Sequence, residues 1–554
     1  RGYLMEKKVE KGLTTRALAI GIVYTLFVSV SMTYMECFHT YGLPWAGSVI
    51  GQYVDPSWNV APWFWNIMYT FILLGIISLL PGKYRLNRQE ITVIMVMTML
   101  SVPMVMPQNH IVGVPWYAPL WFGLIPKLWG APYDTTMKYF VPWMTPSITN
   151  QWQWPTGFNG RPNGVTPAPF DMTMQALGST FWWLGQWISL MFLMVFVAAL
   201  LRRMWIEKES LPFPNVALGM ELVDKFAEGT EGAAKSKLAK ISREKWLLLG
   251  ILIAQIMLMP GWLWKIYDSM KLPTTAFAVT KTVHTGVAGD WMNLVIPVIP
   301  IALCWTSPFG LGLSLTMPVD LLVSFIIVWI VAIVIGVNVE VSMGTISALP
   351  ANAKLSDYVN KAIMNFIPGT TIGQTGGGGW AMVAFGVVVA SAIYPLVTAT
   401  GREYVKEVFR LIRSPSAEAE KGEALSYRWL ACGAVAFFLI YLAFYAPTPA
   451  APALWYIAIV QFVNVLIWVG GARYVAETGA WGGYWCDGGY IMNQFSGYSI
   501  GMVRNGLGAV IGRSVTDSSK NGPIAYACVA CSGSAFQERT IVAQSTPWMM
   551  EGFA

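Results

Sequence analysis

Long stretches without any charged side chain constrain this sequence more than any other feature. Each is close to or above the roughly 20 apolar residues that an α-helix needs to cross a bilayer. The charge-free stretches are 17–35, 56–82, 91–126, 172–201, 246–264, 291–319, 321–339, 362–401 and 429–472. The last is long enough for two helices, and Pro447-Thr-Pro449 predicts a turn between them. The sequence therefore predicts about ten membrane-spanning helices.

The spans are expected to be helices because a helix satisfies its own backbone hydrogen bonds in lipid. The ten-residue alternation of a lipid-facing barrel is not present in the sequence. Several apolar segments carry Pro or Gly, so re-entrant or broken segments are expected beside the full spans. The predicted fold class is an all-α polytopic membrane protein.

Composition excludes other classes of protein. Of the 554 residues, 55% are hydrophobic and only 12% are charged, whereas an ordinary soluble domain carries roughly 25% charged residues. A soluble enzyme, a disordered protein and a nucleic-acid binder all fit this composition poorly.

The distribution of Lys and Arg predicts the orientation. If the N-terminus is cytoplasmic and each stretch crosses once, the cytoplasmic segments carry 23 of the 36 basic residues and the outer segments carry 8. Basic residues collect on the cytoplasmic side of membrane proteins. The net charge of +7 is thus mainly a feature of one face, and no nucleic-acid partner is predicted.

The chain is expected to form a transmembrane helical domain over 1–473 and a Gly-rich surface or re-entrant region over 474–554. An outer cap rich in Trp and Pro is predicted at 107–176, and the main cytoplasmic loops are predicted at 202–245 and 402–428.

Both cytoplasmic loops contain a helical pattern. Pro212 and Pro214 break the first loop early, and 216–225 then has an amphipathic pattern. Charges of alternating sign over 402–413 are typical of a solvated helix face.

Asp320 is the only charged residue between Trp291 and Val339. An ionisable group near a membrane span is costly and marks a candidate functional site, here for a proton or a coupling cation. The alternative is a helix start, because Pro318 suits a first turn and the helix dipole favours an acid there. Both interpretations stay open.

A second candidate is a Gly-rich run before an apolar helix. Such a run permits irregular backbone, and transporters place broken helices at their binding sites. The alternatives are a flexible lead into a helix or close helix packing. The preceding segment 291–316, which is interrupted by Pro and Gly, and a polar insertion after residue 107 are further candidates for the pathway. The residues predicted to line it, besides Asp320, are Gln374, Gly376, Gly377, Gly378, Gly379, Trp380, Gln108 and Asn109.

No catalytic or metal-binding motif is evident. Cys528 and Cys531 have C-x-x-C spacing but no second pair nearby, and the histidines show no ligand spacing. No nucleophile motif of the G-x-S-x-G type and no H-E-x-x-H is present. We therefore predict no cofactor, no metal and no enzymatic activity.

Several short motifs resemble those of an uncharacterised prokaryotic membrane family related to the oligopeptide transporter (OPT) superfamily. Their order and spacing match from about residue 80 to the end. The motifs are Leu86-Asn-Arg88-Gln-Glu90, Trp205-Ile-Glu207-Lys-Glu209-Ser-Leu-Pro-Phe-Pro214 followed by Met220-Glu221-Leu, Pro318-Val-Asp320-Leu-Leu, Gln374 to Trp380, Glu423-Ala-Leu-Ser-Tyr-Arg428, and Ala472-Arg-Tyr-Val-Ala-Glu477-Thr-Gly479.

The resemblance implies an all-helical fold of the oligopeptide-transporter type in the cell membrane of a prokaryote. It also implies secondary, usually proton-driven, transport of peptides or a similar small solute. The expected partners are the lipid bilayer and that solute.

The ends depart from the family pattern. The chain begins with Arg1, and its last residues, Met549 to Ala554, resemble the family's loop before a final membrane hairpin. The expectation is that the ends are missing or that a partner chain supplies the last helices; a homo-oligomer is a further expectation. The alternative function is a non-transporting scaffold or anchor subunit of a larger membrane assembly.

Overall fold

The computed structural model is helical throughout the residues that it describes, with no β-strand among them. The chain divides into two compact units, and each is considered by itself. Unit 1 comprises Arg1–Pro107 and Pro212–Met317, and unit 2 comprises Gln108–Leu211 and Pro318–Ala554. The described residues are 13–41, 62–79, 86–105, 170–227, 249–250, 252–253, 319–329, 331, 378–448, 451 and 454–478.

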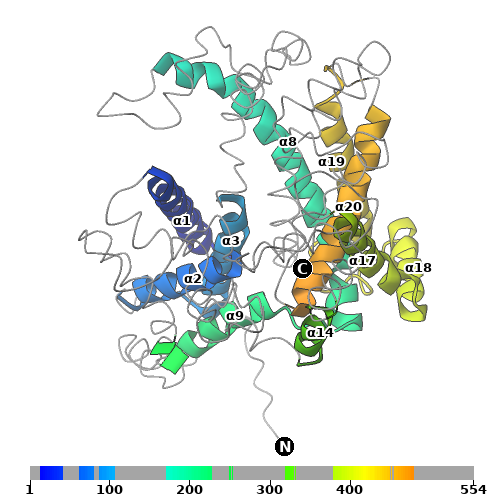
Figure 1. The fold of residues 1–554 in the computed structure, drawn as a ribbon, viewed down its shortest axis with the longest axis horizontal. Coiled ribbons are helices and arrows are strands. Elements are labelled where there is room, and N and C mark those ends of the chain that lie inside the picture. The colour runs from blue at the N-terminus through cyan, green and yellow to red at the C-terminus, as the bar shows by residue number, and fades with distance from the viewer. Residues whose placement is uncertain are drawn as a thin grey trace, which may run out of the picture. The chain divides into compact units, whose positions relative to one another are not determined.

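Unit 1 contains α1 (Thr15–Tyr41), α2 (Pro62–Leu79), α3 (Arg88–Val105) and α9 (Pro214–Ala227). α3 packs against each of the other three (Figure 1). Its apolar residues recur at helical spacing and bury one common core. The buried residues of this core are Tyr24, Val28, Tyr69, Leu73, Leu74, Ile77, Leu86, Ile91, Ile94, Met95 and Val223.

Unit 2 contains the remaining described helices. Its elements are α8 (Phe170–Arg203), the π-helical turn η4 (Met204–Lys208), α14 (Val319–Trp329), α17 (Gly378–Val397), α18 (Ala399–Arg413), α19 (Tyr427–Ala443) and α20 (Leu454–Thr478). The main helix pairs are α8 with α19 and α17 with α20.

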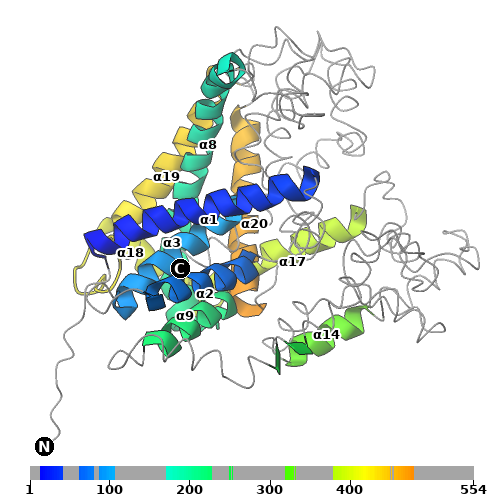
Figure 2. The ribbon, with the colours of Figure 1, turned by 90° about the vertical axis from the view of Figure 1, so that its left-hand side faces the viewer.

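Aromatic residues and a glycine join α8 to α19, which run side by side (Figure 2). The rings of Phe192 and Phe437 stack with centroids 4.7 Å apart. Phe196 lies directly over Gly433, where an added Cβ would come within 2.5 Å of its ring. The absence of a side chain at Gly433 therefore allows the two helices to approach closely.

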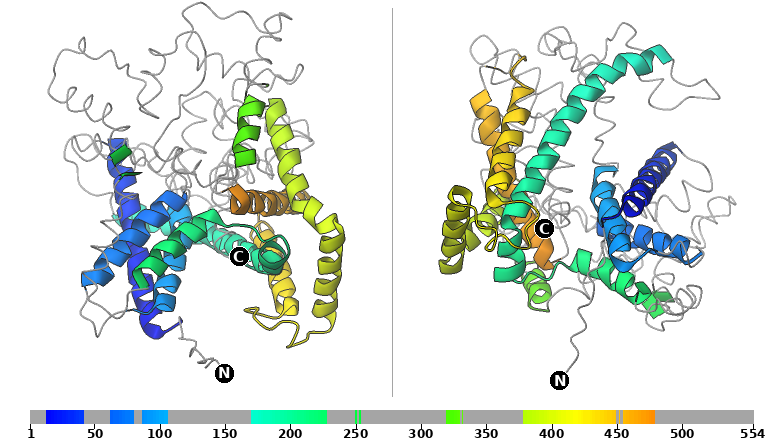
Figure 3. Two further views of the ribbon diagram at one scale, coloured as in Figure 1. Left: turned by 90° about the horizontal axis from the view of Figure 1, so that it is seen from below. Right: turned by 180° about the vertical axis from the view of Figure 1, so that it is seen from behind.

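The long apolar stretch 362–401 ends in a bend between α17 and α18 (Figure 3, left). Pro395 cannot donate a backbone hydrogen bond, and α17 stops two residues later. Thr398 then caps α18, because its hydroxyl accepts a hydrogen bond from the Gly401 amide at 3.2 Å. The chain passes there from an apolar helix to a charged one.

α17 and α20 pack closely at Gly470. A Cβ on this residue would lie 2.0 Å from the carbonyl oxygen of Val388. The Ser391 hydroxyl also donates to the Gly470 carbonyl at 3.3 Å. Small residues and serine hydroxyls of this kind stabilise helix pairs inside membranes.

These observations bear out the helical fold class in the described residues and leave the number of spans as a prediction. Two described helical segments are long and apolar enough to cross a membrane, Leu184–Lys208 and Leu454–Thr478. The expected turn also follows α19, where Thr448 donates its amide to the Tyr445 carbonyl. The predicted amphipathic segment 216–225 lies on α9, and the charged segment 402–413, predicted as a solvated helix face, lies on α18.

Candidate functional site

The C-terminal end of α8 departs from regular helix. In η4 the Glu209 amide donates to the Met204 carbonyl at 2.9 Å, a π-type bond that spans five residues. Ser210 and Phe213 follow with φ angles of 52° and 45°, which side-chain-bearing residues adopt only when their surroundings enforce them. π-turns and such angles concentrate at functional sites. This end of α8 is therefore a candidate functional site.

Two arginines at this end hold a buried glutamate. Arg202 makes a two-pronged contact with Glu423, with nitrogen–oxygen distances of 3.1 and 3.2 Å. The Glu423 side chain is only 3% exposed. Arg203 pairs with Glu207 at 3.0 Å and lies 4.0 Å from Glu423. The buried carboxylate is thus compensated by two guanidinium groups, as a buried charge requires.

A further ion pair joins the same end of α8 to α20. Arg473 donates to Glu209 at 2.6 Å, and both side chains are largely buried. Three of the motifs singled out in the sequence, at 205–214, 423–428 and 472–479, therefore supply residues to neighbouring ion pairs in unit 2. We call Arg202, Arg203, Glu209, Glu423 and Arg473 the charged cluster.

Tyr404 of α18 contacts the backbone of α8 beside the charged cluster. Its hydroxyl donates to the Leu200 carbonyl at 2.5 Å. Burial raises the pKa of Tyr404, so the hydroxyl remains a donor at neutral pH. Since both carboxylates of the cluster are paired with arginine, the arrangement can hold α8, α18, α20 and the segment before α19 together.

In unit 1, the motif at 86–90 also supplies a carboxylate that joins two helices. Asn87 and Glu90 form a reciprocal cap at the start of α3, with each side chain accepting from the other's backbone amide at 2.7 and 3.0 Å. The Glu90 carboxylate also accepts from Thr14 and Arg16 of the α1 end. Glu90 therefore fixes α1 against α3.

Uncharged polar side chains lie deeper within the apolar helices of unit 2. Gln186 of α8 is 2% exposed, and its Oε1 accepts from the Tyr445 hydroxyl at 3.4 Å. Its Nε2 has no hydrogen-bond partner among the described residues. A buried amide donor without a partner is costly, and each such group requires an explanation.

α20 carries a second and larger group. Gln461, Asn464 and Trp468 are 1%, 0% and 1% exposed. Asn464 Nδ2 lies 3.5 Å from Gln461 Oε1. Gln461 Nε2 and Trp468 Nε1 have no partner in the part of the chain that the structure describes. We call Gln461, Asn464 and Trp468 the α20 polar face.

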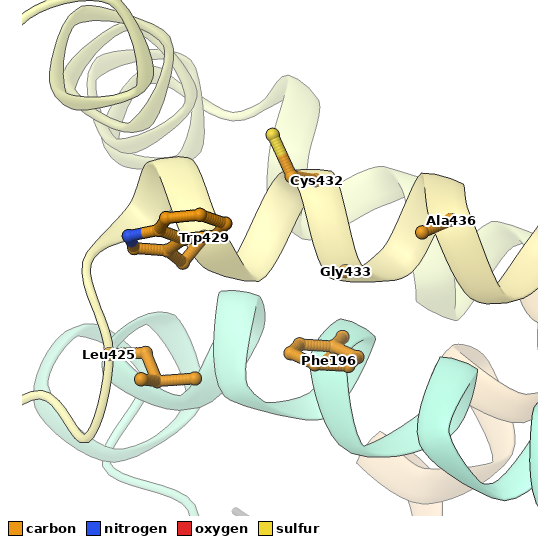
Figure 4. Close-up of a pocket in the computed structure, with 6 residues that line it drawn as sticks. All are labelled: Phe196, Leu425, Trp429, Cys432, Gly433 and Ala436. Atoms are coloured by element: carbon orange, nitrogen blue, oxygen red, sulfur yellow. The ribbon is translucent and has the colours of Figure 1, made fainter.

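An apolar groove of about 360 Å³ lies between α8 and α19 (Figure 4). It is open to the surface, and its lining offers no charged group. Such a groove suits an apolar chain better than a polar solute. Its lining residues are Phe196, Leu425, Trp429, Cys432, Gly433 and Ala436.

No group of three or more His, Cys, Asp or Glu side chains that could hold a metal ion occurs among the described residues.

The residues that the sequence predicts to line a transport pathway do not form one site among the described residues. Asp320 lies exposed in the first turn of α14, where its carbonyl accepts from the Ser324 hydroxyl at 2.8 Å. Gly378, Gly379 and Trp380 form the start of α17, so the Gly-rich run leads directly into a helix. The other predicted pathway residues, Gln374, Gly376, Gly377, Gln108 and Asn109, lie outside the described residues.

Sequence reasoning passed over the buried amides because it searched for charges. The signal was present. Gln461 and Asn464 are the only Asn or Gln between residues 429 and 472, and they stand three residues apart on one face of a helix. A search for uncharged polar residues inside apolar stretches would have found both.

Comparison with known proteins gives one match. A family model described as a family of unknown function (DUF6785) matches residues 7–482, which is most of the chain. No curated protein and no solved structure matches.

Proposed function

We propose that this chain, which belongs to the DUF6785 family of unknown function, is a secondary active transporter of oligopeptides or a similar small solute, driven by protons. It would be a multi-pass protein of the prokaryotic cell membrane with about ten spans and a cytoplasmic N-terminus. The resemblance of its motifs to the OPT superfamily supports this proposal.

Exposed apolar side chains support insertion in a membrane. On α1, Val23, Leu26 and Val30 are 68%, 60% and 68% exposed. On α19, Trp429 and Leu439 are 67% and 57% exposed. Soluble monomers rarely expose apolar surface along whole helices, whereas lipid covers such a surface without cost.

The single observation that carries the transport proposal is the set of buried amides with unmet donors inside apolar helices. Gln186 and Gln461 each present an Nε2 group without a partner among the described residues. A solid scaffold gains nothing from such groups, because an apolar residue of the same shape would be more stable there. A protein that binds a polar solute needs them.

Uptake by purified protein in proteoliposomes tests the proposal. A higher proton concentration outside the vesicles, together with a negative potential inside them, should drive accumulation of tritiated trialanine. A proton ionophore should abolish the accumulation. Absence of driven uptake for the series from dialanine to tetraalanine would refute the peptide-transport proposal.

Asp320 is the proposed coupling residue, and its amide variant tests that role. Asp320→Asn should abolish driven uptake, because an amide cannot release a proton, and should leave the unfolding temperature unchanged at this exposed helix start. Asp224→Asn in α9 is the control, with the same change at a partly exposed carboxylate that pairs with Arg88, and should retain uptake. Full uptake by Asp320→Asn would remove Asp320 from the mechanism.

A non-transporting scaffold or anchor subunit is the second candidate. The charged cluster favours it, since its ion pairs fix helices and offer no ligand site. A scaffold should co-purify with a fixed partner chain and show no uptake.

A further inference from the structure

The α20 polar face points away from α17 and away from the exposed side of α20; α19 also contacts this helix. With about 100° of rotation per residue, Gly470 lies opposite Gln461, and Gly470 is where α17 packs. Ile459, which is 41% exposed, lies opposite Trp468. The polar face is thus turned toward the protein interior and is not the face that α17 covers.

The groups left unmet on this face are donors. Gln461 Oε1 is occupied by Asn464 Nδ2, which leaves the Nε2 group as the free end of the amide. The indole of Trp468 can only donate. A ligand for this face must therefore supply hydrogen-bond acceptors.

The acceptors should be uncharged. The face contains no cationic side chain, and burial of an anion without a countercharge costs far more than burial of a hydrogen-bonded carbonyl. Peptide carbonyl groups fit these requirements better than a free carboxylate does.

The spacing gives the length of the ligand. Gln461 and Trp468 are seven residues apart, which is about 10 Å along a helix at 1.5 Å per residue. An extended peptide rises about 3.3 Å per residue, so about three residues bridge the two donors. A single amino acid cannot reach both.

We propose that Gln461 Nε2 and Trp468 Nε1 donate hydrogen bonds to two backbone carbonyls of an oligopeptide of at least about three residues, which lies along α20 once the residues that cover this face in the structure move away. This inference rests on the proposed transport function and names its ligand class and two binding residues. A site that recognises backbone carbonyls selects peptides by their length and not by their side chains.

Equilibrium binding of tritiated trialanine to the purified full chain tests the inference. Gln461→Met keeps the volume and removes the donor, and Trp468→Phe removes the indole N–H. Loss of one hydrogen bond should weaken trialanine binding by about three- to tenfold in each variant. Trialanine should also bind more tightly than dialanine, and alanine should bind weakest. Phe462→Leu, on the exposed face of the same helix, is the matched control and should keep wild-type affinity.

Stability separates ligand binding from a structural role. Because Gln461 Nε2 has no partner among the described residues, Gln461→Met should keep or raise the unfolding temperature of the ligand-free protein. An amide that joins helices would show the opposite, a lower unfolding temperature.

The outcomes are distinguishable. If the wild type binds trialanine and both variants bind it equally well, the donors serve only a buried water or the fold, and this inference is wrong while the transport proposal stands. If the wild type binds none of the peptides from dialanine to tetraalanine, the proposed function fails and the inference fails with it.

Discussion

Glu90 gathers more hydrogen bonds than any other carboxylate among the described residues whose contacts are given above. It accepts from the Thr14 hydroxyl at 2.6 Å, from the Arg16 guanidinium at 2.5 and 3.2 Å, and from the Asn87 amide at 3.0 Å. Burial opposes its ionisation, but these donors outweigh burial and lower the pKa of Glu90 below 4.5. The residue therefore joins α1 to α3 most strongly in its charged form.

Replacement of Glu90 by Gln tests this connection. Glu90→Gln should lower the free energy of unfolding by about 1–2 kcal/mol at pH 7, a value reduced because Arg16 is partly exposed. Asp224→Asn, which breaks the more exposed pair with Arg88, should cost at most about 1 kcal/mol. Thermal unfolding of the detergent-solubilised protein measures both. Equal losses in the two variants would contradict the role given to Glu90.

The same residue predicts a pH dependence. Its folded pKa is lowered, so its stabilisation is present above the ordinary value of 4.5 and is lost as the pH falls through the folded pKa. The difference in unfolding temperature between wild type and Glu90→Gln should be full at pH 7 and should shrink below about pH 4.5. A difference that stays constant from pH 7 to pH 3 would show that Glu90 acts without its charge.

At this scale the sequence predicted which short motifs matter but not what they contact. Arg202 and Glu423 are 221 residues apart in the chain, and no local pattern pairs them. The pairing depends on the packing of α8 with α19, which sequence periodicity alone cannot supply. Asp320 could be recognised from its isolation among apolar residues, and the structure places it in the first turn of α14, as the helix-start interpretation predicted.

The helices themselves follow more directly from the sequence. The apolar stretches 172–201 and 429–472 form most of α8, α19 and α20, because each stretch is long enough for a helix. All three helices continue past the charges that bound the stretches. η4 was not predictable in this way. A π-turn differs from an α-turn by one extra residue, and Met204 to Lys208 carry no signal for it other than the prolines that follow.

The contact between α17 and α20 depends on a glycine. Gly470→Ala should destabilise the protein by about 1–3 kcal/mol or more, because the new Cβ would lie 2.0 Å from the backbone carbonyl oxygen of Val388 and neither helix can yield cheaply. Gly386→Ala is the matched control on α17. An added Cβ at Gly386 meets nothing within 4 Å, so alanine should be neutral or stabilising by about 0.5–1 kcal/mol.

Thermal unfolding of the two glycine variants, measured in the same detergent, gives the comparison. If Gly470→Ala is as stable as Gly386→Ala, the close approach of α17 and α20 at this point is wrong.

For the whole molecule, hydropathy and basic residues make one joint prediction of topology. The charge-free stretches predict about ten spans, and the 23 to 8 division of basic residues predicts which ends are cytoplasmic. The described residues include α18, whose charged pattern suits a solvated position, and α19, whose exposed apolar side chains suit lipid. The short connection between these two helices should therefore lie at the membrane surface on the cytoplasmic side.

Single cysteines in a cysteine-free background test the topology with a membrane-impermeant thiol reagent. Ala417→Cys, exposed in the predicted cytoplasmic segment 402–428, should react only after the cells are permeabilised. Ser147→Cys, in the predicted outer segment 107–176, should react in intact cells. A protein with Cys432 as its single cysteine should resist the reagent in intact and in permeabilised cells, because this exposed residue lies on the apolar helix α19 at the groove, where lipid would cover it. Labelling of Ala417→Cys in intact cells would invert the orientation, and labelling of Cys432 in membranes would place α19 outside the lipid.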